Sequence, residues 1–68
     1  MQLSACNQFK GTISSIKLGG VMAEVIVDIG GNQIVSALTR GSAESLGLRE
    51  GMEVVAIIKS TEVIIGKE

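Results

Sequence analysis

The chain has 68 residues, of which 46% are hydrophobic, and its formal net charge is −1. It has a single cysteine and no histidine, which excludes an internal disulfide and a closed structural zinc site. It has one aromatic residue and no basic excess, so it lacks the stacking rings and positive charge of single-strand nucleic-acid binders.

A chain of this length has room for one domain, which we expect to span residues 1–68. Domains near this size bury only about 60% of the surface that the unfolded chain exposes, so their stability is marginal. Because disulfides and structural zinc are excluded, oligomerisation is the remaining aid. No apolar run is long enough to cross a bilayer, and the N-terminus does not resemble a signal peptide. We therefore expect a cytoplasmic oligomer with neither a membrane nor a nucleic acid as its partner.

β-Branched residues and tight-turn signals predict three strands in the first part of the chain. The predicted strands cover residues 11–18, 21–29 and 33–39, separated by turns at Gly19-Gly20 and at Gly30-Gly31-Asn32. In the second strand every alternate residue from Val21 to Ile29 is apolar, which predicts that this face is buried.

The pattern changes in the segment RGSAESLGLREG, which predicts a short helix. Ser42 is the expected N-cap, Glu44 suits the first turn, and Gly47 suits the left-handed position that ends a helix. The fourth and fifth predicted strands are residues 52–59 and 62–66. This order predicts an all-β fold, a five-stranded OB-type Greek-key barrel with one short helix between strands three and four.

The run VVAII, residues 54–58, is apolar on both faces of its predicted strand. One face is expected to line the barrel interior and the other to be covered by a neighbouring subunit. A small sandwich with an adhesive edge strand is the alternative. We favour the oligomer because the chain has almost no other source of stability.

The chain carries little catalytic chemistry. It has no histidine to transfer protons near neutral pH and no acid–base pair at a recognisable spacing, and no histidine can activate Cys6 as a nucleophile. We therefore expect a protein that is not an enzyme and has no cofactor.

Two polar segments near the ends of the chain, SACN (4–7) and KST (59–61), remain as candidates for a binding site. They supply hydroxyls, an amide, backbone N–H groups and the Lys59 ammonium, which are the donors and the cation that small tetrahedral oxyanions need. Each residue taken singly is more often solvated surface. Together they indicate an oligomeric β-barrel that can bind an anion.

The same two segments carry a resemblance to a known family. The sequence resembles the molbindins, small molybdate-binding proteins built from one OB-type domain of the Mop or TOBE family. Family members begin with a segment similar to LSACNQFKGTI, usually containing S-A-R-N-Q, and end with one similar to AIIKSTEVII. Between them lie paired glycines, a MAEV strand and an S-x-x-x-L-G-L-x-x-G crossover, so the resemblance covers nearly the whole chain.

The resemblance implies a cytoplasmic homohexamer, a trimer of dimers, that stores or buffers molybdate or tungstate at subunit interfaces. The N-terminal segment of one subunit and the KST segment of a partner would close around one oxyanion, without a direct protein ligand to the metal. The residues carried over to this site are Ser4 (hydroxyl), Ala5 and Cys6 (backbone N–H), Lys59 (ammonium) and Ser60 (hydroxyl and N–H). A second site near the threefold axis is implied at Gly20 and Val21.

Cys6 departs from the family pattern, which usually has arginine at this position. Arginine supplies a permanent charge and a fork of N–H donors that fits oxyanions, whereas cysteine supplies neither. Backbone donors survive the change, so we expect a site that is present but weaker or differently selective. Contact of the thiol with the metal centre is a further alternative. A second function also stays open: a hexameric scaffold or interaction module with a weakened oxyanion site.

Overall fold

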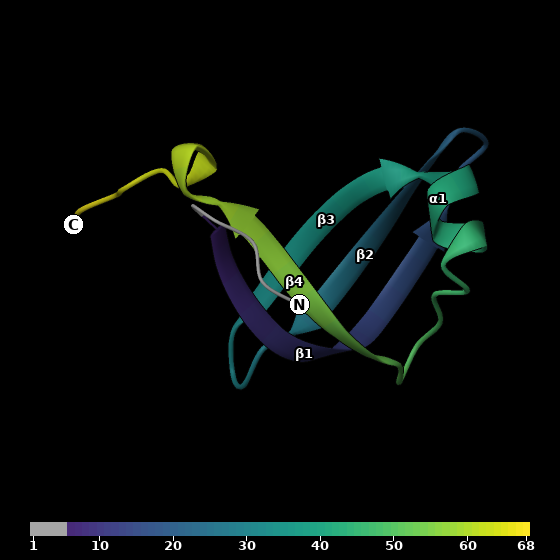
Figure 1. Cartoon of the computed structure of the whole chain (residues 1–68), viewed down its shortest axis with the longest axis horizontal. Helices are drawn as coiled ribbons and strands as arrows, with labels where there is room; N and C mark the ends of the chain where they lie inside the picture. Colours follow the sequence, from purple (N-terminus) through teal and green to yellow (C-terminus); the bar gives the residue numbers. More distant parts are fainter. Residues whose placement is uncertain (1–5) are drawn as a thin grey trace.

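The computed structural model describes residues 6–68 of the chain. The elements follow in the order β1 (Cys6–Leu18), β2 (Met22–Asp28), β3 (Gln33–Thr39), α1 (Arg40–Ser45), β4 (Glu53–Lys59) and the 3-10 helix η1 (Ser60–Glu62). The strands form one antiparallel sheet in the order β3-β2-β1-β4, and not a sandwich of two sheets. The sheet curls so that its edge strands, β3 and β4, border an open face (Figure 1). Neither helix in the described part of the chain is long and apolar enough to span a bilayer.

The long strand β1 produces the curl, because its two halves pair with different neighbours. Its first half, as far as Thr12, pairs with β4, and its second half pairs with β2. Gly11 lies where the pairing changes, and a Cβ atom there would be 2.5 Å from the Asp28 carbonyl oxygen. A β-bulge follows directly after Ile13 and adds to the bend.

The core centres on Ile13, Val25 and Val27, which lie on the paired strands β1 and β2. The predicted buried face of the second strand is confirmed for Ala23, Val25 and Val27. Val21 belongs to the same predicted face but is 76% exposed, because it lies in the turn before β2 begins. Burial of Ala23, Val25 and Val27 fixes the register of β2, since a slip of one residue would turn these side chains to the other face of the sheet.

The predicted helix is present, but its N-cap is Thr39 and not Ser42. Thr39 is the last residue of β3, and its hydroxyl accepts a hydrogen bond from the Ser42 N–H at 3.1 Å. An extended strand residue already has the backbone conformation that an N-cap requires, so the strand leads directly into the helix. Two other predictions are confirmed: Gly47 follows the helix with a φ of +64°, and Gly30 and Gly31 both have positive φ in the turn after β2.

Two predicted strands differ from those in the structure by more than one residue at an end. The first begins at Cys6 instead of residue 11, because the polar segment before Gly11 pairs with β4. The fifth, residues 62–66, is not formed, since η1 ends at Glu62 and the described chain beyond it has no regular secondary structure. A strand needs a neighbouring edge for its backbone hydrogen bonds, and η1 directs the tail away from its own sheet (Figure 1). The predicted five-stranded barrel is therefore corrected: the described residues form a four-stranded, OB-like curled sheet.

Candidate functional site

The described parts of the two polar segments predicted to form the binding site lie at the same end of the sheet. β1 begins where β4 ends, and the antiparallel register pairs Cys6 with Lys59. Ser60 follows as the first residue of η1, and both Lys59 and Ser60 are exposed. Ser4 and Ala5, which were also predicted for this site, lie outside the described residues. The structure thus brings the backbone of Cys6 beside Lys59 within a single chain.

Lys59 has no carboxylate partner in the described part of the chain, where the one ion pair joins Arg40 and Glu44. Asn7, whose amide is among the expected anion donors, donates a hydrogen bond to the Ile58 carbonyl at 3.3 Å and so connects the ends of the two strands. This end of the sheet therefore has a lysine on β4 opposite the backbone of Cys6 and a serine directly after it, which together offer an ammonium, a hydroxyl and backbone N–H groups. Such a set suits an oxyanion, because charge-assisted hydrogen bonds are stronger than neutral ones.

The second predicted site, at Gly20 and Val21, lies in the turn between β1 and β2. This turn is at the opposite end of the sheet from Lys59 (Figure 1). Gly20 faces open space, since no other atom lies within 4 Å of the position of an added Cβ. The turn is therefore accessible to a ligand or to a neighbouring subunit.

Arg40 lies beside this turn, although sequence reasoning did not select it. Its guanidinium donates a hydrogen bond to the Gly19 carbonyl at 3.1 Å, and its backbone N–H donates to the Val21 carbonyl at 2.7 Å. The Glu44 carboxylate lies 3.7 Å from its Nε and partly neutralises the charge. In the sequence, Arg40 directly follows the third strand. Because this strand runs antiparallel to the second, its end lies beside the turn that precedes the second strand, and this position could have indicated Arg40.

The amino-acid sequence also matches a known protein family over almost its whole length. Residues 3–65 match the family model of the TOBE domain. The chain belongs to the TOBE domain family. One relative, molybdenum-pterin-binding protein 1 of Clostridium pasteurianum, is 48% identical over 66 residues. That match covers 96% of this chain and 97% of the relative, so the similarity extends over nearly the full length of both.

Solved structures share the fold of this TOBE domain. A molybdate-binding protein from Sporomusa ovata superposes with a TM-score of 0.91 at 36% identity, over 98% of this chain and 100% of that one. The cytoplasmic molybdate-binding protein ModG, in a form with molybdate bound, superposes with a TM-score of 0.87 at 38% identity. This second match covers 94% of our chain and 46% of ModG. The OB-like fold and the resemblance to the Mop proteins are thus confirmed.

Proposed function

We propose that this TOBE domain protein binds molybdate or tungstate in the cytoplasm and acts in their storage or homeostasis, and not as an enzyme. The observation that supports the proposal is the antiparallel pairing of Cys6 with Lys59, because it brings the backbone of a lysine opposite the first described residue of the chain. Two relatives matched over nearly their full length support it, because the Clostridium protein binds molybdenum-pterin and the Sporomusa protein binds molybdate. The cytoplasmic location is supported by the relative ModG.

The proposed anion site contains the Ser4 hydroxyl, the N–H groups of Ala5 and Cys6, the Lys59 ammonium, and the hydroxyl and N–H of Ser60. A tetrahedral dianion that leaves water needs several charge-assisted hydrogen bonds in fixed directions. Lys59 supplies the charge, and the ladder between β1 and β4 holds its backbone opposite Cys6. Because cysteine has no charge, recognition depends more on backbone and hydroxyl donors than it would with arginine.

The second site proposed for the protein is the turn at Gly20 and Val21, with Arg40 as the neighbouring cation. The hydrogen bond from the Arg40 guanidinium to the Gly19 carbonyl supports this proposal, because it holds the guanidinium beside the turn. The apolar side chains of Leu18, Val21 and Met22 are exposed around the same turn. Exposed apolar surface of this kind favours an interface between subunits, in agreement with a homohexamer.

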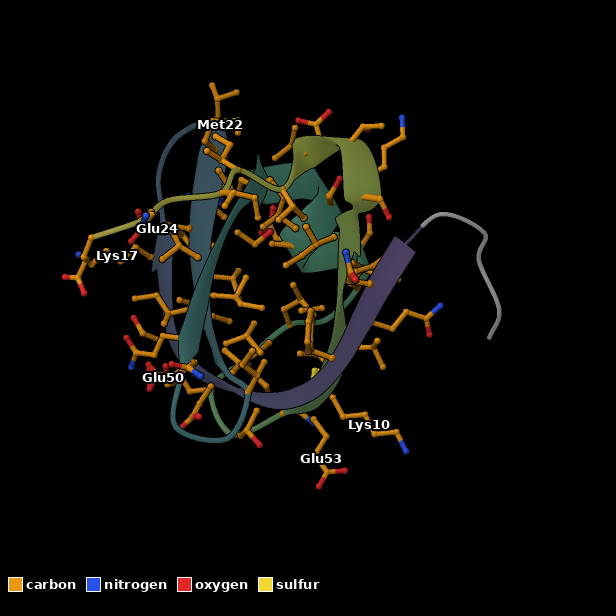
Figure 2. All side chains as sticks on the ribbon, turned by 90° about the vertical axis from the view of Figure 1, so that its left-hand side faces the viewer. Lys10, Lys17, Met22, Glu24, Glu50 and Glu53 are labelled. Atoms are coloured by element: carbon orange, nitrogen blue, oxygen red, sulfur yellow. The ribbon has the colours of Figure 1, made fainter. Side chains whose placement is uncertain are left out.

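The site is tested with Lys59→Ala, titrated with molybdate and tungstate by calorimetry. A hydrogen bond to a charged group contributes about 1.5–3 kcal/mol, so we expect binding to weaken by about tenfold or more. Lys10→Ala is the matched control. Lys10 is an exposed lysine on the same strand pair, opposite Val55 (Figure 2). It is about 13 Å along β1 from the paired residue of Lys59.

We expect Lys10→Ala to bind molybdate as tightly as the wild type. Equal affinities for all three proteins would show that Lys59 is ordinary surface and that the assigned site is wrong. Sedimentation of each variant confirms that the assembly is unchanged, which separates a loss of binding from a loss of structure.

The second candidate function is a hexameric scaffold or interaction module with a weakened oxyanion site. The observation that favours it is Cys6 in the position where the family usually has arginine. The same calorimetry distinguishes the two functions when sulfate is included as a third anion. Binding of molybdate or tungstate in preference to sulfate supports the binding protein, and no binding of any anion by an intact oligomer supports the scaffold.

A further inference from the structure

The side chain of Arg40 takes the place of a backbone donor in the turn between β1 and β2. The Gly19 N–H donates a hydrogen bond to the Met22 carbonyl at 2.7 Å. In a closed β-turn the Met22 N–H would donate a hydrogen bond back to the Gly19 carbonyl. Here the Gly19 carbonyl instead accepts a hydrogen bond from the Arg40 guanidinium at 3.1 Å. The turn is therefore completed by a side chain from α1, which lies beside it (Figure 1).

Two further contacts hold Arg40 in this place. Its backbone N–H donates a hydrogen bond to the Val21 carbonyl at 2.7 Å, which binds the start of α1 to the same turn. The Glu44 carboxylate, four residues further along the helix, lies 3.7 Å from the Nε atom of Arg40. Because the backbone bond does not involve the side chain, a substitution at this position leaves it in place. Such a substitution therefore tests the guanidinium alone.

The bond to the guanidinium sets the direction of an N–H group as well as that of a carbonyl. The peptide that joins Gly19 to Gly20 is trans and planar, so its C=O and its N–H point in opposite directions. Glycine tolerates many backbone conformations, so a peptide between two glycines rotates easily unless another group holds it. Because the guanidinium binds the C=O, the Gly20 N–H is directed away from Arg40.

The side of the turn to which this N–H points is open. Neither the Gly20 N–H nor the Val21 N–H donates a hydrogen bond to another described residue. No atom lies within 4 Å of a Cβ atom added to Gly20, and Val21 is 76% exposed. Neighbouring backbone N–H groups in turns are donors that bind anions. The turn thus offers a directed donor whose acceptor must come from outside the described chain.

We propose that Arg40 is a positioning residue of the second anion site: its guanidinium holds the Gly19 carbonyl and so directs the Gly20 N–H toward a bound oxyanion. The inference rests on the second site proposed above and names the residue that prepares it. The anion accepts the Gly20 N–H on the side of the peptide that faces away from Arg40. The guanidinium therefore acts through the peptide, and affinity depends on its N–H donors more than on its charge.

NMR of protein labelled with 15N-glycine measures this site directly. The chain has nine glycines, and the Gly20 signal is the one missing from Gly20→Ala, whose added Cβ has open space. Molybdate is titrated into the wild type and into Arg40→Met at equal ionic strength, since methionine is also a good helix former. We expect the Gly20 amide signal to move in both proteins. The affinity of Arg40→Met should be roughly two- to tenfold weaker, the equivalent of one hydrogen bond.

Arg49→Met is the matched control, because it removes the same charge from the other arginine of the chain. Arg49 is exposed, and its side chain makes no hydrogen bond to another described residue. We expect this variant to keep the wild-type affinity at the turn. A chemically synthesised chain with citrulline at position 40 then separates positioning from charge. Citrulline keeps N–H donors at the same reach but is neutral, so it should retain most of the affinity that Arg40→Met loses.

A measurement without anion tests the positioning step by itself. The Gly20 amide signal of Arg40→Met should differ from that of the wild type before molybdate is added, because the peptide has lost the donor that holds it. An unchanged signal would overturn the inference. Equal weakening by Arg49→Met, or by citrulline and methionine alike, would also overturn it, since charge would then explain the loss. The comparison of citrulline with the wild type stands even where Arg40→Met does not fold.

The same titration distinguishes failure of the inference from failure of the second site. A Gly20 signal that does not respond to molybdate in the wild type would reject the second site and the inference with it. A response that is equally strong in Arg40→Met would leave the site in place and reject the positioning role. Binding at the first site is followed separately through Lys59→Ala, so neither result depends on it.

Discussion

Replacement of Gly11 by alanine should destabilise the fold at the point where β1 changes its pairing partner. The added Cβ would meet the Asp28 carbonyl oxygen at 2.5 Å and side-chain atoms of Val27 and Ile29 at 2.7 and 3.0 Å. The nearest of these atoms belongs to the backbone of β2, so it cannot rotate away as a flexible side chain can. Relief therefore requires β2 to shift relative to β1, and Val27 at this position belongs to the core.

The expected loss follows from two opposing effects. Overpacking of a close-packed site costs about 1–3 kcal/mol. Alanine restricts the unfolded chain more than glycine does, which offsets about 0.4–1 kcal/mol of this cost. A net loss of about 1–2 kcal/mol lowers the Tm of a domain of this size by roughly 4–16 °C. Circular dichroism is the suitable assay, because the chain has no tryptophan or tyrosine to report unfolding by fluorescence.

Gly41→Ala is the matched control for this experiment. Gly41 lies in α1, and no atom is within 4 Å of the position of its added Cβ. Alanine is favoured over glycine in helices by up to about 1 kcal/mol, so Gly41→Ala should keep or raise the Tm. All three proteins are compared at one concentration, because assembly contributes to their apparent stability. A Tm for Gly11→Ala at or above that of the wild type would refute the close approach of β1 and β2 as the basis of the curl.

Cys6→Arg should tighten molybdate binding, because a guanidinium adds charge-assisted hydrogen bonds, which are roughly twice as strong as neutral ones. Calorimetry at matched salt measures the change in affinity. Equal or weaker binding in an intact oligomer would show that a positively charged side chain at position 6 does not contact the anion. Thr39→Ala should reduce the free energy of unfolding by about 0.5–2 kcal/mol, because the Ser42 N–H loses its capping acceptor. Thr39→Ser keeps the hydroxyl and is the control; an equal loss in both variants would contradict the capping role.

The sequence by itself determined the features that depend on residues close together in the chain. The turn at Gly30-Gly31 and the left-handed Gly47 follow from local backbone preferences, so they could be predicted before any strand was paired. The alternation of apolar residues in β2 identified its buried face for the same reason. The segments around Cys6 and Lys59 are short motifs, and short motifs sufficed to predict the family.

Only the tertiary structure decided the features that join distant segments. The register that pairs Cys6 with Lys59, the close approach at Gly11 and the position of Arg40 beside the second candidate site all require strands to be aligned across the sheet. The fifth predicted strand shows the physical reason most directly. The composition of residues 62–66 favours a strand, but a strand forms only where an edge can accept its backbone hydrogen bonds, and η1 turns this segment away from the edges of its own chain.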